Sequence, residues 1–248
     1  MALPFFYNSS YNPGQAELLL DEDNSRHIVQ VLRMQRGEQL QLTDGRGNLL
    51  TAAILDDHKK KCRVQILSTA WQPPGEKKVS IALSLLKNAN RFEWFLEKAT
   101  EIGVTTIIPL LSERTERQHF RQDRLHNILV SAMLQSQQSW LPILQPPTPL
   151  MAVIANPDHH HLFIAHCLEE QKIALADAAR SASLPAAFAE TPASIAASRL
   201  ILIGPEGDFS PNEIDLAIQK GFLPVTLGVT RLRTETAGIV AATLLCNL

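Results

Sequence analysis

Two short, largely apolar runs near the end of the chain, residues 199–203 and 224–227, each lead directly into a glycine. Apolar runs of this length that are bounded by glycine are typical of buried strands. A glycine at the end of a strand lets backbone amides approach a ligand where a β-carbon would block them. Gly204 and Gly228 therefore predict a ligand-binding edge of a sheet.

Composition and charge describe an ordinary globular protein, since the 248 residues are 45% hydrophobic and carry a formal net charge of −2. This length suffices for one large domain or for two. The near-neutral total argues against wholesale electrostatic binding of nucleic acid. A local patch of lysine and arginine is enough for phosphate contacts, so RNA is not excluded.

The three cysteines, Cys62, Cys167 and Cys246, are odd in number and have no metal-like spacing. They predict structural cysteines without a disulfide framework or a bound metal, which suits a reducing compartment. The chain starts without the basic and apolar segments of a signal peptide, and it has no apolar run of the roughly 20 residues that span a bilayer. We therefore expect a cytoplasmic protein with no membrane segment.

A Pro-Pro-Gly turn within the polar stretch 68–78 separates two regions of different periodicity. Upstream, alternating apolar runs joined by short turns predict hairpin strands. These runs are residues 38–42, 49–55 and 62–67. A helix that begins at a cap near Asp23 or Asn24 and continues through Leu32 interrupts them. We predict a small β-barrel domain over residues 1–70 and a second domain over residues 75–248.

In the second domain, strands and helices alternate, which predicts an α/β fold with a mostly parallel sheet and a ligand at the carboxyl ends of its strands. The expected strands are residues 79–86, 104–111, 162–165, 200–203 and 225–227. The expected helices are residues 91–102, 121–138, 211–220 and 236–248. A proline-broken loop follows the second helix, and the alanine- and serine-rich residues 174–198 are expected to form a connection.

The turn Gly204-Pro205-Glu206-Gly207 lies between a strand and a helix whose start is marked by Ser210, Pro211 and the capping-box residue Glu213. Amides in such a turn can bind a carboxylate or a hydroxyl-rich group. A tight turn without a ligand is the alternative, and the second glycine edge at Gly228 favours a pocket. The domain lacks the glycine-rich motifs of dinucleotide and nucleoside triphosphate sites.

A polar cluster precedes the last, almost wholly apolar helix: Arg231, Arg233 and Glu235 fall close together there. Such a cluster at an apolar boundary is typical of a site, although a helix cap beside a solvated arginine is an alternative. Arginine suits a phosphate or a developing oxyanion, because its planar fork donates several hydrogen bonds and keeps its charge.

Further basic residues follow the first two strands of the second domain. Lys87 and Arg91 lie at the end of the first strand, and Arg114 follows the second. Acidic residues around Arg114 predict ion pairs for most of its basic neighbours, so Arg114 alone of that group is a candidate for RNA contact. The run His159–His161 is interpreted as an exposed turn before a strand and not as a metal tract.

Three segments resemble signature segments of the bacterial 16S ribosomal RNA uridine-N3 methyltransferases, and the resemblance covers essentially the whole chain. The segments are residues 97–104, 203–207 and 232–237. The family belongs to the SPOUT superfamily. The resemblance implies an N-terminal PUA-like RNA-binding barrel and a C-terminal methyltransferase domain with a deep trefoil knot. It further implies a homodimer, S-adenosylmethionine as methyl donor and 16S ribosomal RNA of the small ribosomal subunit as substrate.

The resemblance also assigns roles to individual residues. It places the cofactor against Leu202, Ile203, Gly204, Glu206, Gly207, Leu227, Gly228, Leu232, Thr234, Thr236 and Ala237. Arg233 is the candidate that stabilises negative charge on the uridine, and Glu235 either accepts the N3 proton or holds Arg233. The candidates for RNA contact are Arg26, Arg33, Lys87, Arg91, Arg114 and Arg231.

The chain departs from the family pattern at four positions. Asp208 stands where a glycine is usual, and Leu134, Gln138 and Thr230 stand where the family has charged residues. The loss of these charges leaves a non-catalytic RNA-binding or ribosome-assembly factor on the same fold as one alternative. A transfer-RNA methyltransferase is a second alternative. A nucleotide-binding metabolic enzyme is disfavoured by the missing phosphate-loop motifs.

Overall fold

The structure, a computed structural model, describes residues 3–116, 120–169, 171–183 and 198–248. The chain forms two compact units. The first contains Met1–Pro74 and Met133–Leu141, and the second contains Gly75–Ala132 and Pro142–Leu248. Much of the expected connection over residues 174–198 lies outside the described residues, but its first part forms a short strand and a helix. No helix among the described residues is long and apolar enough to cross a membrane.

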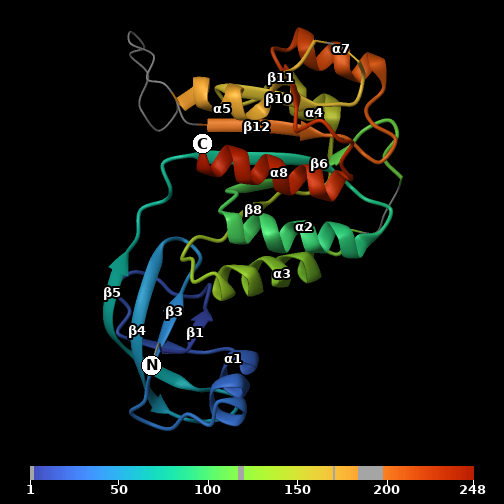
Figure 1. The fold of residues 1–248 in the computed structure, drawn as a ribbon. Helices are drawn as coiled ribbons and strands as arrows, with labels where there is room; N and C mark the ends of the chain where they lie inside the picture. Colours follow the sequence, from blue (N-terminus) through green and yellow to red (C-terminus); the bar gives the residue numbers. More distant parts are fainter. Residues whose placement is uncertain (1–2, 117–119, 170, 184–197) are drawn as a thin grey trace. The chain divides into compact units, whose positions relative to one another are not determined.

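In the described part of the first unit, five strands form one curled sheet in the order β1-β3-β4-β5-β2 (Figure 1). The strands are β1 (Phe5–Tyr7), β2 (Glu17–Leu19), β3 (Gln39–Thr43), β4 (Asn48–Asp56) and β5 (Arg63–Trp71). Alternate residues of β3 and β4, such as Leu40, Leu42 and Leu50, are fully buried and form the core, as the period of a half-buried strand requires. The predicted hairpin strands are confirmed.

Four details of the first unit differ from the prediction. β1 and β2 were not expected, because three-residue strands are too short to show a period. β5 continues to Trp71, since that residue pairs with Asn48 of β4. The helix α1 (Glu22–Arg26) begins earlier than predicted, because Asp21 is its N-cap and accepts the Asn24 amide at 2.8 Å. It is followed by the π-helix η1 (His27–Val31) where a continuous α-helix was expected.

Within the first unit, the segment 133–141 packs on residues 1–74, although it is distant from them in sequence. The amide of Gly47 donates to the carbonyl oxygen of Ser139 at 2.9 Å, and the Trp140 indole donates to the Gln72 carbonyl at 3.0 Å. The predicted helix 121–138 ends early: α3 spans Gln122–Gln135. The left-handed backbone of Gln137, with φ of 56°, turns the chain into this segment.

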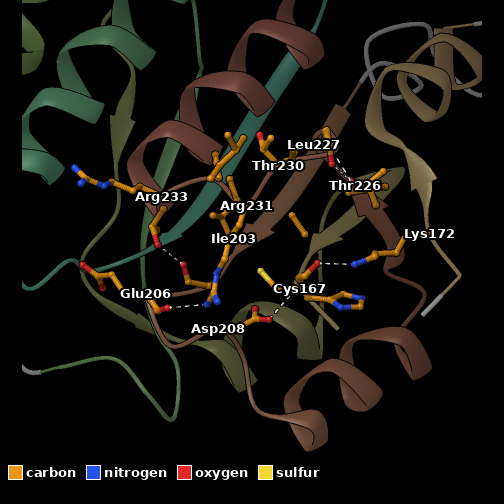
Figure 2. A pocket seen from close by; sticks show the side chains of 18 of the residues that line it. Cys167, Lys172, Ile203, Glu206, Asp208, Thr226, Leu227, Thr230, Arg231 and Arg233 are labelled. Carbon is orange, nitrogen blue, oxygen red and sulfur yellow. Dashed lines mark hydrogen bonds between the residues drawn. The ribbon is translucent and has the colours of Figure 1, made fainter. Parts of the chain in front are cut away.

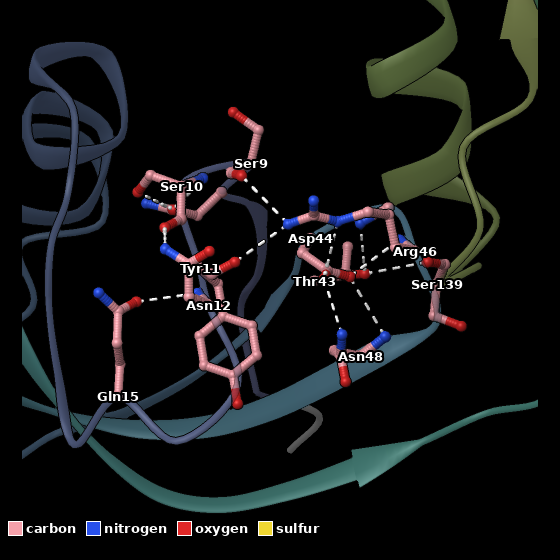
Figure 3. Close-up of polar contacts among 12 residues, drawn as sticks. Ser9, Ser10, Tyr11, Asn12, Gln15, Thr43, Asp44, Arg46, Asn48 and Ser139 are labelled. Carbon is pink, nitrogen blue, oxygen red and sulfur yellow. Dashed lines mark hydrogen bonds and ion pairs between the residues drawn. The ribbon is translucent and has the colours of Figure 1, made fainter.

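A buried carboxylate organises the loop that receives this segment (Figure 3). The side chain of Asp44 is 1% exposed and accepts hydrogen bonds from the backbone and side chains of Arg46 and Asn48. Arg46 also donates to the carbonyl oxygen of Tyr11 at 3.0 Å. Because every oxygen of the buried carboxylate has donors, the burial cost of its charge is offset and the loop is held in one conformation.

In the described part of the second unit, eight strands form one sheet. Seven of them follow the order β11-β13-β10-β12-β6-β7-β8, and β9 also pairs with β7. They are β6 (Lys78–Ser84), β7 (Thr106–Leu111), β8 (Ile143–Leu144), β9 (Thr148–Pro149), β10 (His161–Ala165), β11 (Ile173–Ala174), β12 (Ser198–Ile203) and β13 (Leu223–Thr226). All pairings of these strands are parallel. The predicted parallel sheet is confirmed.

Helices pack on both faces of this sheet (Figure 1). They are α2 (Ala89–Ile102), the unit's part of α3, α4 (Leu150–Ala155), α5 (Leu175–Ser183), α7 (Pro211–Gln219) and α8 (Thr234–Asn247). Leu200 and Leu202 of β12 pack with Ile154 of α4 and Ile214 of α7. The alternate residues of β12 point to the opposite face, where α8 contacts β12, β6 and α2.

Some elements of the second unit were missed or misplaced. The proline-broken loop contains β8, β9 and α4, which are too short to show a period. α8 begins at Thr234 and not at Thr236, because Arg233 already has the extended backbone of an N-cap. The run His159–His161 is not wholly an exposed turn. The ring of His159 lies 2.7 Å from the Ser80 hydroxyl, and His161 begins β10.

Candidate active site

A cavity of about 590 Å³ lies at the carboxyl ends of β10, β12 and β13 (Figure 2). Its wall is formed by the residues that directly follow these strands and by the segment that leads into α8. The lining residues are Ala165, His166, Cys167, Lys172, Ile203, Gly204, Pro205, Glu206, Asp208, Val225, Thr226, Leu227, Gly228, Val229, Thr230, Arg231, Leu232, Arg233, Thr234 and Ala237. The two glycine edges of the sequence therefore meet in one cavity, at the place where parallel sheets bind ligands.

The turn after β12 is fixed by its carbonyl groups. The hydroxyl of Thr234 donates to the carbonyl oxygen of Gly204 at 3.0 Å, and the amide of Asp208 donates to that of Pro205 at 2.9 Å. Two guanidinium groups bind the next two carbonyl oxygens: Arg231 donates to Glu206 at 3.4 Å, and Arg114 donates to Gly207 at 2.7 Å. The amides of Glu206 and Gly207 donate to no partner within the described ranges. The turn thus leaves donors for a ligand while its acceptors are already used.

Space is tight at the start of this turn, which favours glycine there. A β-carbon on Gly204 would lie 3.1 Å from the Phe209 amide nitrogen and 3.2 Å from its ring. The buried side chain of Glu213 holds the other end, because it accepts the amides of Ser210 at 2.9 Å and Glu113 at 2.8 Å. The predicted capping box therefore also fixes the loop after β7.

Arg233 and Glu235 lie in different surroundings although they are neighbours in sequence. Arg233 lines the cavity and is exposed, and its guanidinium makes no hydrogen bond or ion pair with any residue of the described ranges. Glu235 is buried in the first turn of α8 and does not line the cavity. Its Oε1 lies 3.6 Å from Nε of Arg91, and its Oε2 has no hydrogen-bond partner among the described residues.

The sequence matches the RNA methyltransferase domain family over residues 73–246 and the RNA methyltransferase PUA domain family over residues 20–67. The first match spans most of the chain. The chain belongs to the RNA methyltransferase family.

Individual members of this family resemble the chain over nearly its whole length. It is 31% identical to the ribosomal RNA small subunit methyltransferase E of Buchnera aphidicola, over 98% of this chain and 95% of that protein. The crystal structure of a probable rRNA methyltransferase from Porphyromonas gingivalis is 39% identical, with a TM-score of 0.84 over 97% of this chain and 95% of the other. A Neisseria gonorrhoeae ribosomal RNA small subunit methyltransferase E bound to S-adenosyl methionine is 26% identical, with a TM-score of 0.80 over 97% and 95% of the two chains.

Most of the residues that the sequence nominates for the cofactor of this methyltransferase come together in the cavity. Those that line it are Ile203, Gly204, Glu206, Leu227, Gly228, Leu232, Thr234 and Ala237. Gly207 and Thr236 lie outside the lining, and Leu202 is fully buried in the core of the sheet. Leu202 points away because alternate residues of a strand face opposite sides.

The candidates for RNA contact are scattered, and most have a partner within the protein. Arg26 pairs with Glu22 at 2.9 Å, and Lys87 lies 3.4 Å from Glu116. Arg91 pairs with Glu235, while Arg114 and Arg231 hold carbonyls of the turn after β12. Arg33 is exposed and has a left-handed backbone with φ of 57°.

The segment after β10 of the methyltransferase is the part of the cavity that the sequence reading missed. His166, Cys167 and Lys172 line it, and so does Asp208 from the turn after β12. The strand over residues 162–165 was expected, and ligands bind beyond the carboxyl ends of parallel strands. The position of His166 directly after that strand was therefore the available signal.

Proposed function

We propose that this protein transfers a methyl group from S-adenosylmethionine to N3 of a uridine in the 16S ribosomal RNA of the small ribosomal subunit. One observation carries the proposal: both glycine edges and an unpaired arginine, Arg233, line a single cavity in an RNA methyltransferase fold. The family relatives named for the small ribosomal subunit support this choice of RNA.

The residues present fit S-adenosylmethionine. A volume of about 590 Å³ lies within the range of roughly 300–1,000 Å³ that is usual for sites of ligands of this size. Apolar side chains, among them Ile203, Leu227 and Leu232, can pack against the adenine. The amide of Glu206, which lines the cavity and has no acceptor in the described ranges, can bind a polar group of the ribose or the amino acid.

When bound, S-adenosylmethionine supplies an electrophilic methyl group on a sulfonium. The contribution of the protein is to hold N3 in line with that group and to stabilise the charge that develops when the N3 proton leaves. We assign the second task to Arg233, since this residue lines the cavity and its exposed guanidinium has no acidic partner in the described ranges. Negative charge on the uridine carbonyl oxygens would be stabilised by its donors.

Glu235 receives a different role in this proposal. Its side chain is buried outside the cavity lining and lies beside Arg91. We therefore assign it to holding Arg91 against the first turn of α8 and not to proton transfer. The N3 proton passes to solvent water as the methyl group is transferred.

The first unit and the oligomeric state complete the proposal. We propose that the PUA-like unit docks the RNA, with Arg26 and Arg33 as phosphate contacts, and that the enzyme acts in the cytoplasm as a homodimer. Light scattering of the purified protein tests the dimer. The trefoil knot that the resemblance implies stays a prediction.

The decisive experiment is methyl transfer from labelled S-adenosylmethionine to small-subunit particles, followed by mass spectrometry of the ribosomal RNA. The proposal expects one N3-methylated uridine in the 16S RNA, and its absence from cells that lack the protein. Methylation of transfer RNA in place of ribosomal RNA would establish the transfer-RNA alternative. Cofactor binding without methyl transfer to any of these RNAs would establish the non-catalytic assembly factor.

A further inference from the structure

Asp208 occupies a backbone conformation that favours glycine. Its φ is +63°, in the left-handed region that residues with a β-carbon rarely adopt. Aspartate and asparagine are among the L-residues that tolerate this region best, because a short polar side chain can bond to the local backbone. Asp208 does so through Oδ1, which accepts the amide of Phe209 at 2.9 Å.

The second oxygen of Asp208 reaches a different segment of the chain. Oδ2 accepts the backbone amide of Cys167 at 2.8 Å, across 41 residues of sequence. Cys167 lies in the segment that follows β10, and both residues line the cavity (Figure 2). The carboxylate therefore ties the wall formed after β10 to the turn formed after β12.

Lys172 holds the same segment from its other side. Its ammonium group donates to the carbonyl oxygens of His166 at 2.9 Å and Leu168 at 2.7 Å. The amide of Cys167 and the carbonyls on either side of that residue are thus bound by two charged side chains. Hydrogen bonds to ionised groups are stronger than those between neutral groups, so the segment is held as a fixed wall of the cavity.

We propose that Asp208 is a positioning residue for the methyl-donor site, and that it acts by holding residues 166–168 against the cavity. Glycine would suit the backbone at this position better but could not bridge the two strand ends. The inference rests on the proposed function, because the occupant of the cavity is taken to be S-adenosylmethionine. It does not require the carboxylate to touch the cofactor or the RNA.

The hydrogen bond from the Cys167 amide to Asp208 is called the bridge below. Three variants separate the effect of losing this bridge from the effects of backbone strain and of lost charge. Asp208→Gly relieves the left-handed strain and removes the bridge. Asp208→Asn tolerates the same backbone and keeps one oxygen that can accept the Cys167 amide. Asp215→Asn, at an exposed position of α7 outside the cavity lining, removes the same charge without touching the bridge.

Calorimetry with S-adenosylmethionine measures the effect on the site. We expect Asp208→Gly to weaken binding by about 10-fold, which corresponds to the loss of a hydrogen bond to a charged group. Asp208→Asn should recover most of the affinity, and Asp215→Asn should bind as the unaltered protein does. In steady-state assays the loss in Asp208→Gly should appear in the KM for the methyl donor, with the KM for RNA unchanged.

Hydrogen exchange of the ligand-free protein measures the bridge itself. In Asp208→Gly the amide of Cys167 has lost its acceptor, so exchange in a peptide over residues 166–172 should accelerate. The same peptide should exchange at the original rate in Asp215→Asn. This readout does not depend on any ligand, and it is taken well below the melting temperature of each variant.

The outcomes distinguish the inference from the proposed function. If the unaltered protein binds no S-adenosylmethionine, the proposed function is wrong, while the exchange data still decide whether Asp208 holds the segment. If the unaltered protein binds the donor and Asp208→Gly binds it equally well, the positioning role is wrong and the proposed function stands. Unchanged exchange in the 166–172 peptide of Asp208→Gly would also overturn the inference.

Discussion

The side-chain hydroxyl of Thr234 donates a hydrogen bond of 3.0 Å to the carbonyl oxygen of Gly204, and the two residues are 30 positions apart in sequence. Thr234 lies in the first turn of α8, and Gly204 begins the turn after β12. Both residues line the cavity. The hydroxyl is buried, so this bond fixes one wall of the site against another without competition from water.

Replacing Thr234 with valine tests the importance of this bond. The change keeps the shape of the side chain but leaves the Gly204 carbonyl without its donor, at a cost of about 1–3 kcal/mol. We expect calorimetry to show weaker binding of S-adenosylmethionine by about 10-fold. Thr234→Ser keeps the hydroxyl and is the matched control. Equal affinity in the valine variant would contradict the role given to this bond.

Replacing Arg233 with alanine tests the charge-stabilising role. Arg233 lines the cavity, and its exposed guanidinium makes no hydrogen bond or ion pair within the described ranges, so its loss should leave the folded structure intact. We expect turnover to fall by about 100-fold, as for the loss of one donor to a developing anion, with little change in cofactor affinity. Single-turnover assays beside calorimetry separate the two effects. Arg233→Lys keeps the charge but not the fork and should recover only part of the rate.

The sequence was sufficient to predict the part of the site that depends on local chemistry. The turn at Gly204 follows a buried strand and precedes a helix marked by Ser210 and Glu213, and the structure has these elements in that order. Parallel strands bring their carboxyl ends to one edge, which places Gly228 in the same cavity as Gly204.

The parts that could not be predicted depend on contacts between distant segments. The bond from Cys167 to Asp208 joins residues 41 positions apart, and nothing in either neighbourhood signals the other. The pairing of Ser139 with Gly47 likewise has no local signature, and the sequence pattern instead predicted a longer helix through Gln138. Hydrophobic periodicity describes which face of an element is buried but not which distant segment covers it.

Gly47 offers a test of the loop that receives residues 133–141. Its φ is +91°, and an added β-carbon would lie 2.7 Å from the Trp140 ring and from the Gln72 carbonyl oxygen. Gly47→Ala should therefore destabilise the first unit by about 2 kcal/mol or more, from left-handed strain together with overpacking. Gly75→Ala is the control, because a β-carbon there meets no atom within 4 Å.

Tryptophan fluorescence can report this effect for the first unit alone. Trp71 and Trp140 belong to the first unit, and Trp94 belongs to the second. In a Trp94→Phe background, urea unfolding followed by fluorescence therefore monitors the first unit. An unfolding midpoint in Gly47→Ala equal to that in Gly75→Ala would show that the loop accommodates the methyl group.

The ion pair between Glu93 and Arg124 predicts a dependence of stability on pH. Hydrogen bonds from Arg124 hold the pKa of the Glu93 carboxyl below its ordinary value. A carboxyl whose pKa is lower in the folded state stabilises the fold above its unfolded pKa, and this stabilisation is lost as the pH falls through the folded pKa. Because the Arg124 side chain is 57% exposed, we expect no more than about 1 kcal/mol.

The measurement is urea unfolding between pH 7 and pH 3, followed by circular dichroism. Glu93→Gln should be less stable than the unaltered protein at neutral pH, and the difference should vanish at the acid end. Glu76→Gln carries the same change in charge at an exposed position without an ion pair in the described ranges. A constant difference across the whole pH range would mean that the carboxylate charge is not the source of the stabilisation.

Arg33 provides a test of RNA docking by the first unit. It is exposed and has no ion pair in the described part of the chain, whereas Arg26 is paired with Glu22. Each phosphate contact contributes about one unit to the slope of log affinity against log salt concentration. For 16S RNA fragments, Arg33→Ala should make that negative slope shallower by about one unit. The change in Arg26→Ala should be smaller, because Glu22 already offsets part of the charge. An unchanged slope in Arg33→Ala, with the protein folded, would remove Arg33 from the docking surface.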